Sequence, residues 1–290
     1  MAPDGVAATA IRGELKSADG TRLAYRAWPV ERATAAATPT QTITVTFAVV
    51  HGHGEHSGRY EQFAHGMARH GMATYAVDLR GHGESEGPRG HVDSWSQWVE
   101  DAAAFVAHVE REAEGEVVPL GHSLGGVVML TTVRTRRLPR AGRFIVSSAA
   151  LKLKARVPAW KTSLAGVTSS IVPRLSMSTD LDATVLSRIP DVVDAYRTDP
   201  RVHSKMSSRL YAEWQRAARE ELEHAGEIKA PFLILAGTAD RLIDPAGSEE
   251  LQRKAPEHSE LHMLAGRYHE PFNDLESDEV FDLIAEWVRR

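Results

Sequence analysis

Val117-Val-Pro-Leu-Gly-His-Ser-Leu-Gly-Gly126 is the stretch that decides the fold of this 290-residue chain. The apolar run Val117–Leu120 predicts a buried strand, and a helical run follows the two glycines at the end of the stretch. Between them, Ser123 occupies the pattern Gly-x-Ser-x-Gly, which marks an abrupt turn from strand to helix. Gly121 and Gly125 are expected where a side chain would collide as the chain reverses. This turn, the elbow, exposes the serine oxygen beside free N–H groups of a helix N-terminus, which stabilise negative charge.

A serine hydroxyl is a poor nucleophile until a base removes its proton. After an elbow the partners are expected in the order acid, then histidine. The strand pattern Pro231–Ala236 is followed by Asp240, and the strand pattern Glu260–Leu264 is followed by His269. Each side chain then lies beyond the carboxyl end of a strand, where open α/β sheets build their sites. We therefore expect a catalytic triad in which His269 removes the proton of Ser123 and Asp240 orients the imidazole.

Both partners have rivals, because the chain contains 14 histidines and many carboxylates. His262 lies inside a strand pattern, which makes it a weaker candidate for the base than His269. Asp244 is the main rival for the acid. Asp240 is preferred because it comes at the first turn after its strand, whereas Asp244-Pro245 is typical of the start of a helix.

The negative charge that develops on an attacked carbonyl oxygen needs at least two hydrogen-bond donors, which form an oxyanion hole. One is expected to be the backbone N–H of Leu124, the residue after the nucleophile. The strand pattern Ile43–Val50 is followed by the loop His51–Gly54, and the second donor is assigned there to the backbone N–H of His53. Loss of one such donor typically costs about 3 kcal/mol of transition-state stabilisation.

Four stretches together are similar to the monoacylglycerol lipase and lysophospholipase group of α/β-hydrolases. They are the elbow, His51-Gly-His-Gly-Glu-His-Ser-Gly-Arg-Tyr60, Asp78-Leu-Arg-Gly-His-Gly-Glu-Ser85, and Gly237-Thr-Ala-Asp240 with Tyr268-His-Glu270. The resemblance implies an α/β-hydrolase fold, a Ser–His–Asp triad, a movable cap over the site, and acyl glycerols or related esters as substrates. It implies no cofactor and no metal.

The same resemblance places Glu55, Arg59 and Tyr196 in a polar pocket for the substrate. The alternative is that they form a structural ion pair and a packed tyrosine, and both interpretations stay open. Three positions depart from the family pattern. Pro119 lies in the strand before the elbow, where it cannot donate a ladder hydrogen bond. His53 is larger than expected in an oxyanion loop, and Arg201 stands where an aliphatic residue is usual.

Strand and helix patterns alternate along most of the chain, which predicts a mostly parallel, doubly wound sheet covered on both faces. Residues 14–28 predict a hairpin around Asp19-Gly20. Residues 93–114 predict a helix that packs on the sheet, with apolar side chains at helical spacing: Trp95, Trp98, Val99, Ala102, Val106 and Val109. In the loop 78–85, Arg80 and His82 are expected to be structural.

The alternation stops between residues 151 and 219, where no strong strand pattern appears. We expect residues 11–150 and 220–290 to form the hydrolase core, 151–219 to form an inserted helical cap, and 1–10 to be loose. Residues 29–41, rich in Ala and Thr, predict a surface loop. Within the cap, five apolar residues predict one face of a helix that receives an acyl chain: Trp160, Leu164, Val167, Ile171 and Leu175.

Composition agrees with an enzyme. With 42% hydrophobic residues the chain can bury a sizeable core, and a net charge of −5 offers no field for nucleic acid. Without cysteine it has neither disulfides nor a thiol nucleophile. The first ten residues lack the basic and apolar regions of a signal peptide, and no run approaches the roughly 20 apolar residues of a spanning helix. The expectation is a cytoplasmic protein whose cap contacts membranes peripherally.

The sequence therefore predicts a serine ester hydrolase that cleaves monoacylglycerols or similar lipid esters through an acyl-enzyme. The alternatives are a carboxylesterase for short soluble esters and a lysophospholipase. Peptide and thioester substrates stay open, since the same triad can cleave both. A remote alternative is a metallo-hydrolase, because His51, His53 and His56 follow a strand at a spacing that can bind zinc. A relative that binds a ligand without catalysis is a further alternative.

Overall fold

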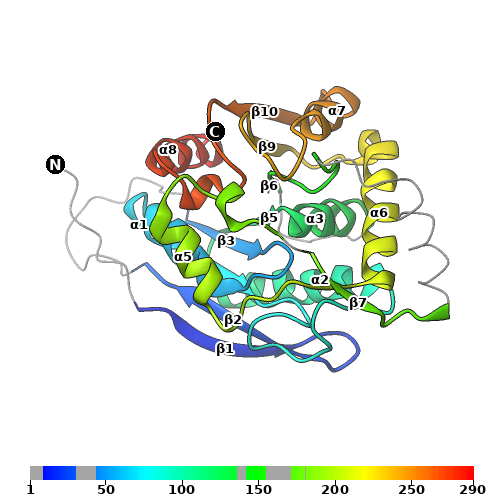
Figure 1. Ribbon diagram of the computed structural model, residues 1–290. Coiled ribbons are helices and arrows are strands. Elements are labelled where there is room, and N and C mark those ends of the chain that lie inside the picture. Colours follow the sequence, from blue (N-terminus) through cyan, green and yellow to red (C-terminus); the bar gives the residue numbers. More distant parts are fainter. Residues whose placement is uncertain (1–8, 31–43, 136–141, 155–170, 180) are drawn as a thin grey trace.

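A computed structural model describes residues 9–30, 44–135, 142–154, 171–179 and 181–290 of the protein (Figure 1). One eight-stranded sheet runs through it in the order β1-β2-β4-β3-β5-β6-β9-β10. The strands from β4 to β10 are parallel, and only β1 and β2 run antiparallel to their neighbours. The sheet strands are β1 (Ile11–Lys16), β2 (Arg22–Trp28), β3 (Val45–Val50), β4 (Ala73–Val77), β5 (Glu116–His122), β6 (Phe144–Ser147), β9 (Phe232–Gly237) and β10 (Ser259–Leu264).

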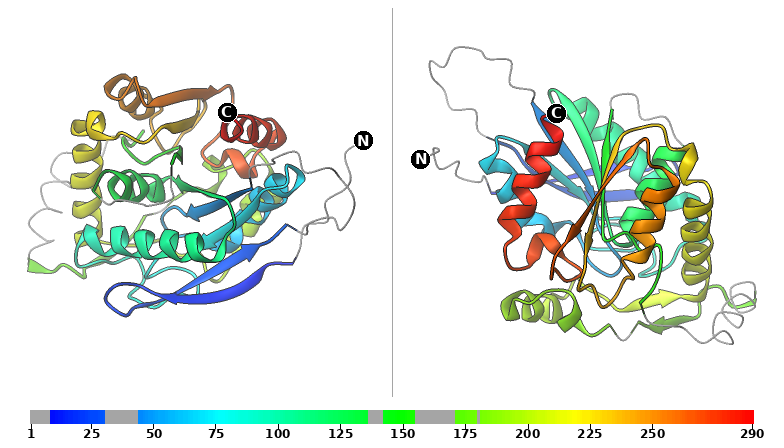
Figure 2. Two further views of the ribbon diagram at one scale, coloured as in Figure 1. Left: turned by 180° about the vertical axis from the view of Figure 1, so that it is seen from behind. Right: turned by 90° about the horizontal axis from the view of Figure 1, so that it is seen from above.

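Helices cover both faces of this sheet, as Figure 2 shows when the sheet is seen from above. Helices α1 and α8 lie on one face, and α2, α3, α6 and α7 lie on the other. The helices are α1 (Glu61–Arg69), α2 (Trp95–Glu112), α3 (Leu124–Thr135), α5 (Pro190–Thr198), α6 (Ser208–Glu223), α7 (Ala246–Lys254) and α8 (Ser277–Val288). Short 3-10 turns are η1 (Ser57–Tyr60), η2 (Ala183–Val185), η3 (Ala225–Glu227) and η4 (Pro271–Asn273). The predicted α/β fold with a mostly parallel, doubly wound sheet is confirmed, as is the hairpin of β1 and β2.

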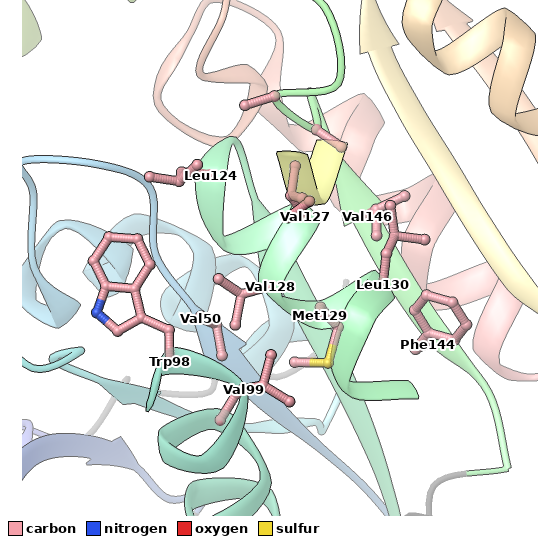
Figure 3. Packing of buried hydrophobic residues seen from close by; sticks show 14 of the residues in the cluster. Val50, Trp98, Val99, Leu124, Val127, Val128, Met129, Leu130, Phe144 and Val146 are labelled. Carbon is pink, nitrogen blue, oxygen red and sulfur yellow. The ribbon is translucent and has the colours of Figure 1, made fainter. Parts of the chain in front are cut away.

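The central helix α3 carries apolar side chains on nearly all sides, and nearly all of its sides are buried. Its residues Val127, Val128, Met129 and Leu130 are fully buried, and Figure 3 shows them between Trp98 of α2 and the strands. The apolar positions predicted for 93–114 are all buried along α2. Such burial stabilises the fold by about 1.5–3 kcal/mol for each large aliphatic side chain. The packing holds the start of α3, and with it the elbow, in a fixed place.

Pro119 lies inside β5 without breaking a ladder. It is opposite Ala48 in the pairing with β3, whereas the pairing with β6 begins only at Leu120. The N–H of Ser123 donates to Ser147 of β6. In a strand, backbone N–H groups an even number of residues apart point to the same neighbouring strand. Residue 119 is four residues before Ser123, so its nitrogen also points towards β6, at a position where β5 and β6 are not yet paired. Pro119, which has no N–H to donate, therefore removes no hydrogen bond from the pairing of β5 with β6.

The predicted cap range contains elements of two kinds. Helix α5, β7 (Ser176–Ser178) and β8 (Lys205–Ser207) lie beyond one end of the parallel strands (Figure 2). Strands β7 and β8 pair antiparallel, which the sequence did not indicate because three residues are too few to show a strand pattern. Helix α6 begins inside the range but packs on α2 and α3 of the core. The division into core and cap stays a prediction.

Several expectations fall on residues that the structure does not describe. Residues 1–8, most of the predicted loop 29–41, and the cap residues Trp160, Leu164 and Val167 lie outside the described ranges. Within those ranges, no helix is both long and apolar enough to cross a membrane.

Candidate active site

The elbow is held by backbone contacts that leave no room for side chains at its glycines. Ser123 has φ of 53°, in the left-handed region that ordinary residues rarely adopt. A Cβ on Gly121 would lie 2.4 Å from the carbonyl oxygen of Gly125. A Cβ on Gly125 would lie 2.3 Å from the carbonyl oxygens of both Val50 and His51. The predicted need for glycine at both positions is confirmed, and the close approach sets the start of α3 against the end of β3.

The structure brings the three predicted triad side chains together. His269 Nε2 lies 2.9 Å from Ser123 Oγ, and His269 Nδ1 lies 2.8 Å from Asp240 Oδ2. The other carboxylate oxygen, Asp240 Oδ1, accepts hydrogen bonds from the backbone N–H groups of Leu242 and Ile243 at 2.8 and 2.9 Å. The carboxylate is therefore fixed on both oxygens, and it can hold the imidazole in one orientation.

The surroundings of His269 and Asp240 shift the pKa values of these two groups in opposite directions. Burial lowers the pKa of His269, but the charge and hydrogen bond of Asp240 outweigh it, so the pKa is raised overall. Burial raises the pKa of Asp240, but the charge and hydrogen bond of His269 and the two backbone donors outweigh it, so the pKa is lowered. A base with raised proton affinity beside a permanently ionised carboxylate suits proton transfer from a serine.

The rival residues lie elsewhere. Asp244 Oδ1 accepts the N–H of Ala246 at 3.1 Å, just before α7. His262 Nε2 pairs with Glu260 at 2.7 Å on the edge strand β10. Neither of these side chains forms a hydrogen bond with Ser123 or His269.

Two backbone N–H groups next to Ser123 are available for a substrate oxygen. Leu124 is the first residue of α3, and His53 follows β3 in the adjoining loop. Neither N–H has a hydrogen-bond partner within the described residues. Their assignment to the oxyanion hole stays a prediction.

The His53 imidazole lies in a cluster of histidine rings. Its ring centroid is 5.7 Å from that of His82 and 5.6 Å from that of His203. Both of its nitrogens are buried, and a polar group of the Lys205 backbone interacts with the ring. Burial, helped by the neighbouring His203 and His51, lowers the pKa of His53 to about 3. Burial lowers the pKa of His203 to about 4. The rings are therefore neutral at pH 7 and tie the oxyanion loop to the segment before β8.

The imidazoles of the proposed zinc motif point to other partners. His51 Nε2 accepts the N–H of Leu79 at 3.0 Å, so Nδ1 carries the proton and donates to Gly52. His56 Nδ1 accepts the N–H of Gly58 at 3.1 Å, so Nε2 donates to Asp199. No group of three potential metal ligands occurs in the described part of the chain. The observed bonds give both histidines a structural role.

Glu55 and Arg59, predicted for the polar pocket, lie together beside the triad. Arg59 Nε donates to Glu55 Oε2 at 3.2 Å, and the Arg59 guanidinium lies 4.6 Å from the ring centre of Tyr196. Glu55 Oε1 accepts from the N–H of Gly52 at 2.6 Å and from the hydroxyl of Tyr60 at 3.0 Å. These contacts include the ion pair of the structural alternative, but Glu55 and Tyr196 also line the cavity described below.

Sequence reasoning missed one residue of this group. Glu270 follows His269 directly, and its Oε2 accepts from Arg59 Nη2 and, at 3.1 Å, from Asn273 Nδ2. Only its position next to the histidine could have indicated it, and a carboxylate beside a histidine is common in sequences. Its pairing with Arg59, which is 211 residues away, follows from the fold alone.

Arg201, the third departure from the family pattern, contacts the core from the cap range. Its guanidinium pairs with Asp199 at 2.8 Å and lies 3.8 Å from Glu84 in the predicted loop 78–85. In that loop Arg80 pairs with Asp101 and Asp19, and the structural role predicted for Arg80 is confirmed.

A cavity of about 670 Å³ opens above Ser123. Three of its polar lining residues, Glu55, Tyr196 and Glu270, all contact the guanidinium of Arg59, and this cluster is its polar end. The rest of its wall is largely apolar and includes Leu153, Leu181, Met206, Trp214 and Ile243. The site thus places a nucleophile in a cavity that has one cluster of polar side chains and an otherwise largely apolar lining.

Comparisons with known proteins agree with this geometry. A family model described as "Serine aminopeptidase, S33" matches residues 41–276. A monoacylglycerol lipase of Mycolicibacterium smegmatis is 31% identical over 98% of this chain and 98% of its own length. A human monoglyceride lipase is 33% identical over 94% of this chain and 89% of its own. The crystal structure of a Paleococcus ferrophilus monoacylglycerol lipase, 31% identical, aligns with a TM-score of 0.77 over 97% of this chain and 98% of that one.

Proposed function

The chain belongs to the serine aminopeptidase, S33 family of the α/β-hydrolase superfamily, and from this we propose that it is a serine ester hydrolase that cleaves monoacylglycerols or similar lipid esters. One observation carries the proposal. Hydrogen bonds run from Asp240 through His269 to Ser123, and Ser123 and His269 line a cavity with a largely apolar wall and a polar end.

In the acylation step, Ser123 Oγ attacks the ester carbonyl carbon while its proton passes to His269 Nε2. The carbonyl oxygen becomes an oxyanion, which accepts hydrogen bonds from the N–H groups of Leu124 and His53. Collapse of this intermediate breaks the bond to the alcohol oxygen, which takes the proton from His269 and leaves. Asp240 remains ionised throughout and stabilises the imidazolium.

Water completes the cycle. It attacks the acyl-enzyme carbonyl, gives its proton to His269 Nε2, and forms a second oxyanion in the same hole. Collapse of that intermediate returns the proton to Ser123 and releases the carboxylic acid. No cofactor or metal takes part in this proposal.

The lining of the cavity supports a lipid substrate. Its apolar wall suits an acyl chain, and its polar end suits the alcohol part. In the proposal, residues 151–219 form a cap whose motion admits the chain. Four large apolar side chains are exposed on the described part of this range, and they support peripheral contact with a lipid surface: Ile171, Val172, Leu175 and Met177.

The test compares wild type with Ser123→Ala on monoacylglycerols, lysophospholipids and short soluble esters. We expect Ser123→Ala to lower kcat about a million-fold, as in triad knockouts elsewhere, and to abolish labelling by a fluorophosphonate probe. Retention of a tenth of the activity would remove Ser123 from the mechanism. We expect kcat/KM to rise with acyl length; a flat or falling series would favour the carboxylesterase alternative.

A further inference from the structure

Glu270 has one carboxylate oxygen engaged and one available. Oε2 accepts hydrogen bonds from Arg59 and Asn273, whereas Oε1 has no hydrogen-bond partner among the described residues. The residue is only 4% exposed, yet it lines the cavity at its polar end, where the proposed function places the alcohol part of the ester. Oε1 is accessible from the cavity, so a ligand or water there can supply the donor that the protein does not.

The charges around this end of the cavity are unbalanced. Glu55 and Glu270 both pair with the single guanidinium of Arg59. Among the described residues that line the cavity there are two carboxylates and no lysine or arginine. His122, which also lines it, stays neutral because burial lowers its pKa to about 3. The polar end therefore carries an excess of negative charge.

From this arrangement, and resting on the proposed function, we infer that Glu270 determines head-group specificity. Its Oε1 accepts a hydrogen bond from a hydroxyl of a neutral, polyol-type leaving alcohol, and its charge rejects esters whose alcohol part is anionic. Glu270 is a substrate-binding residue in this inference and takes no part in proton transfer.

The chemistry of the two substrate classes explains the discrimination. A glycerol hydroxyl can donate a hydrogen bond to a carboxylate. Because this hydrogen bond is charge-assisted, it compensates for the hydrogen bonds to water that the hydroxyl gives up. A phosphate has no comparable donor when it is ionised. It would face two carboxylates in a cavity whose described lining contains no lysine or arginine. Like charges within several ångströms in a protein interior alter binding by more than tenfold. Binding of such an ester would require Arg59 to leave one of its partners.

A purely structural role for Glu270 makes a different prediction. As a clamp for Arg59 alone, its replacement would slow all esters alike, whatever their head group. The ratio of kcat/KM values for two esters with the same acyl chain cancels any such common effect, including a change at the neighbouring His269. The ratio therefore isolates the contact with the head group.

The experiment measures kcat/KM for oleoylglycerol, oleoylglycerol phosphate and oleoylcholine, with p-nitrophenyl butyrate as a reporter without a polyol head group. We expect wild type to favour the neutral and the cationic ester over the anionic one. Glu270→Gln should reduce the preference for oleoylglycerol over its phosphate by about tenfold or more. The matched control is Glu286→Gln, which removes the same charge from a side chain that is 76% exposed, and it should leave the preference unchanged.

Equal turnover of the neutral and anionic esters by wild type would overturn the inference, and this arm needs no variant. An unchanged ratio in Glu270→Gln would also overturn it. These results differ from failure of the proposed function, in which wild type would hydrolyse neither p-nitrophenyl butyrate nor the oleoyl esters, or Ser123→Ala would remain active on them.

Discussion

The close approach between α3 and β3 makes Gly125→Ala the most informative substitution outside the triad. A Cβ at this position would lie 2.3 Å from the carbonyl oxygens of Val50 and His51. An ordinary carbon–oxygen contact is about 3.3 Å or longer, so the helix start or the strand end must shift by about 1 Å. The obstructing atoms belong to the backbone of a central strand, and no side chain can turn aside to relieve the contact.

Two opposing effects set the magnitude. Overpacking in a close-packed core costs about 1–3 kcal/mol, and obstruction by backbone places this substitution at about 3 kcal/mol. Replacing glycine by alanine inside a helix contributes about 1 kcal/mol in the other direction. The net expectation is a loss of about 2 kcal/mol in the free energy of unfolding. The shift also separates the N–H of Leu124 from that of His53, so kcat should fall by about 100-fold or more.

Thermal unfolding and ester hydrolysis measure the two effects separately. For a chain of 290 residues we expect Tm to fall by about 3 °C. The matched control is Gly142→Ala, where a Cβ would meet only Glu116 Oε1 at 3.6 Å, an ordinary contact. Gly142→Ala should leave both Tm and kcat close to wild type. Unchanged stability and full activity in Gly125→Ala would refute the argument from the backbone contact.

Two further predictions concern pH. Asp240→Asn removes the charge that raises the pKa of His269, so the acid limb of kcat/KM should move to lower pH while the plateau falls about 10⁴-fold; an unmoved limb in the pH–rate profile would contradict this. The pKa of His203 is about 4 in the folded protein and about 6.5 when unfolded. Its contribution to stability is therefore complete above pH 6.5 and is lost as the pH falls towards 4, to the extent of about 2 kcal/mol. Urea unfolding at pH 7 and 4.5 should show a smaller pH-dependent loss in His203→Gln than in wild type, and an equal loss would show that His203 does not titrate as described.

Features that depend on local sequence could be predicted. The elbow was predictable because Gly121 and Gly125 are required by the turn itself, and the chain order of Ser123, Asp240 and His269 follows from the strand ends that carry them. The parallel sheet was predictable because strand and helix patterns alternate along most of the chain. These signals lie within a few residues of the structures that they specify.

Features that depend on contacts between distant segments could not be predicted. Glu270 meets Arg59 only because the loop after β10 folds over η1, and nothing near either residue in the sequence indicates it. The β7–β8 ribbon has strands of three residues, and β7 is fully exposed, so no alternation of burial marks it. The unusual size of His53 was visible in the sequence, but its packing against His203 was not, because the partner lies 150 positions further along the chain.

The segment after α5 is attached to the loop after β3 at several points. Asp199 pairs with His56 at 3.0 Å, and the N–H of His203 donates to the carbonyl of Gly54 at 2.9 Å. Because that loop also carries the N–H of His53, detachment of the segment and loss of this proposed oxyanion donor are thermodynamically linked. A compound that binds the outer surface of the attached segment would thus favour the arrangement in which the segment holds the loop after β3, without entering the cavity. A substitution that weakens the attachment of this segment would lower activity from a distance.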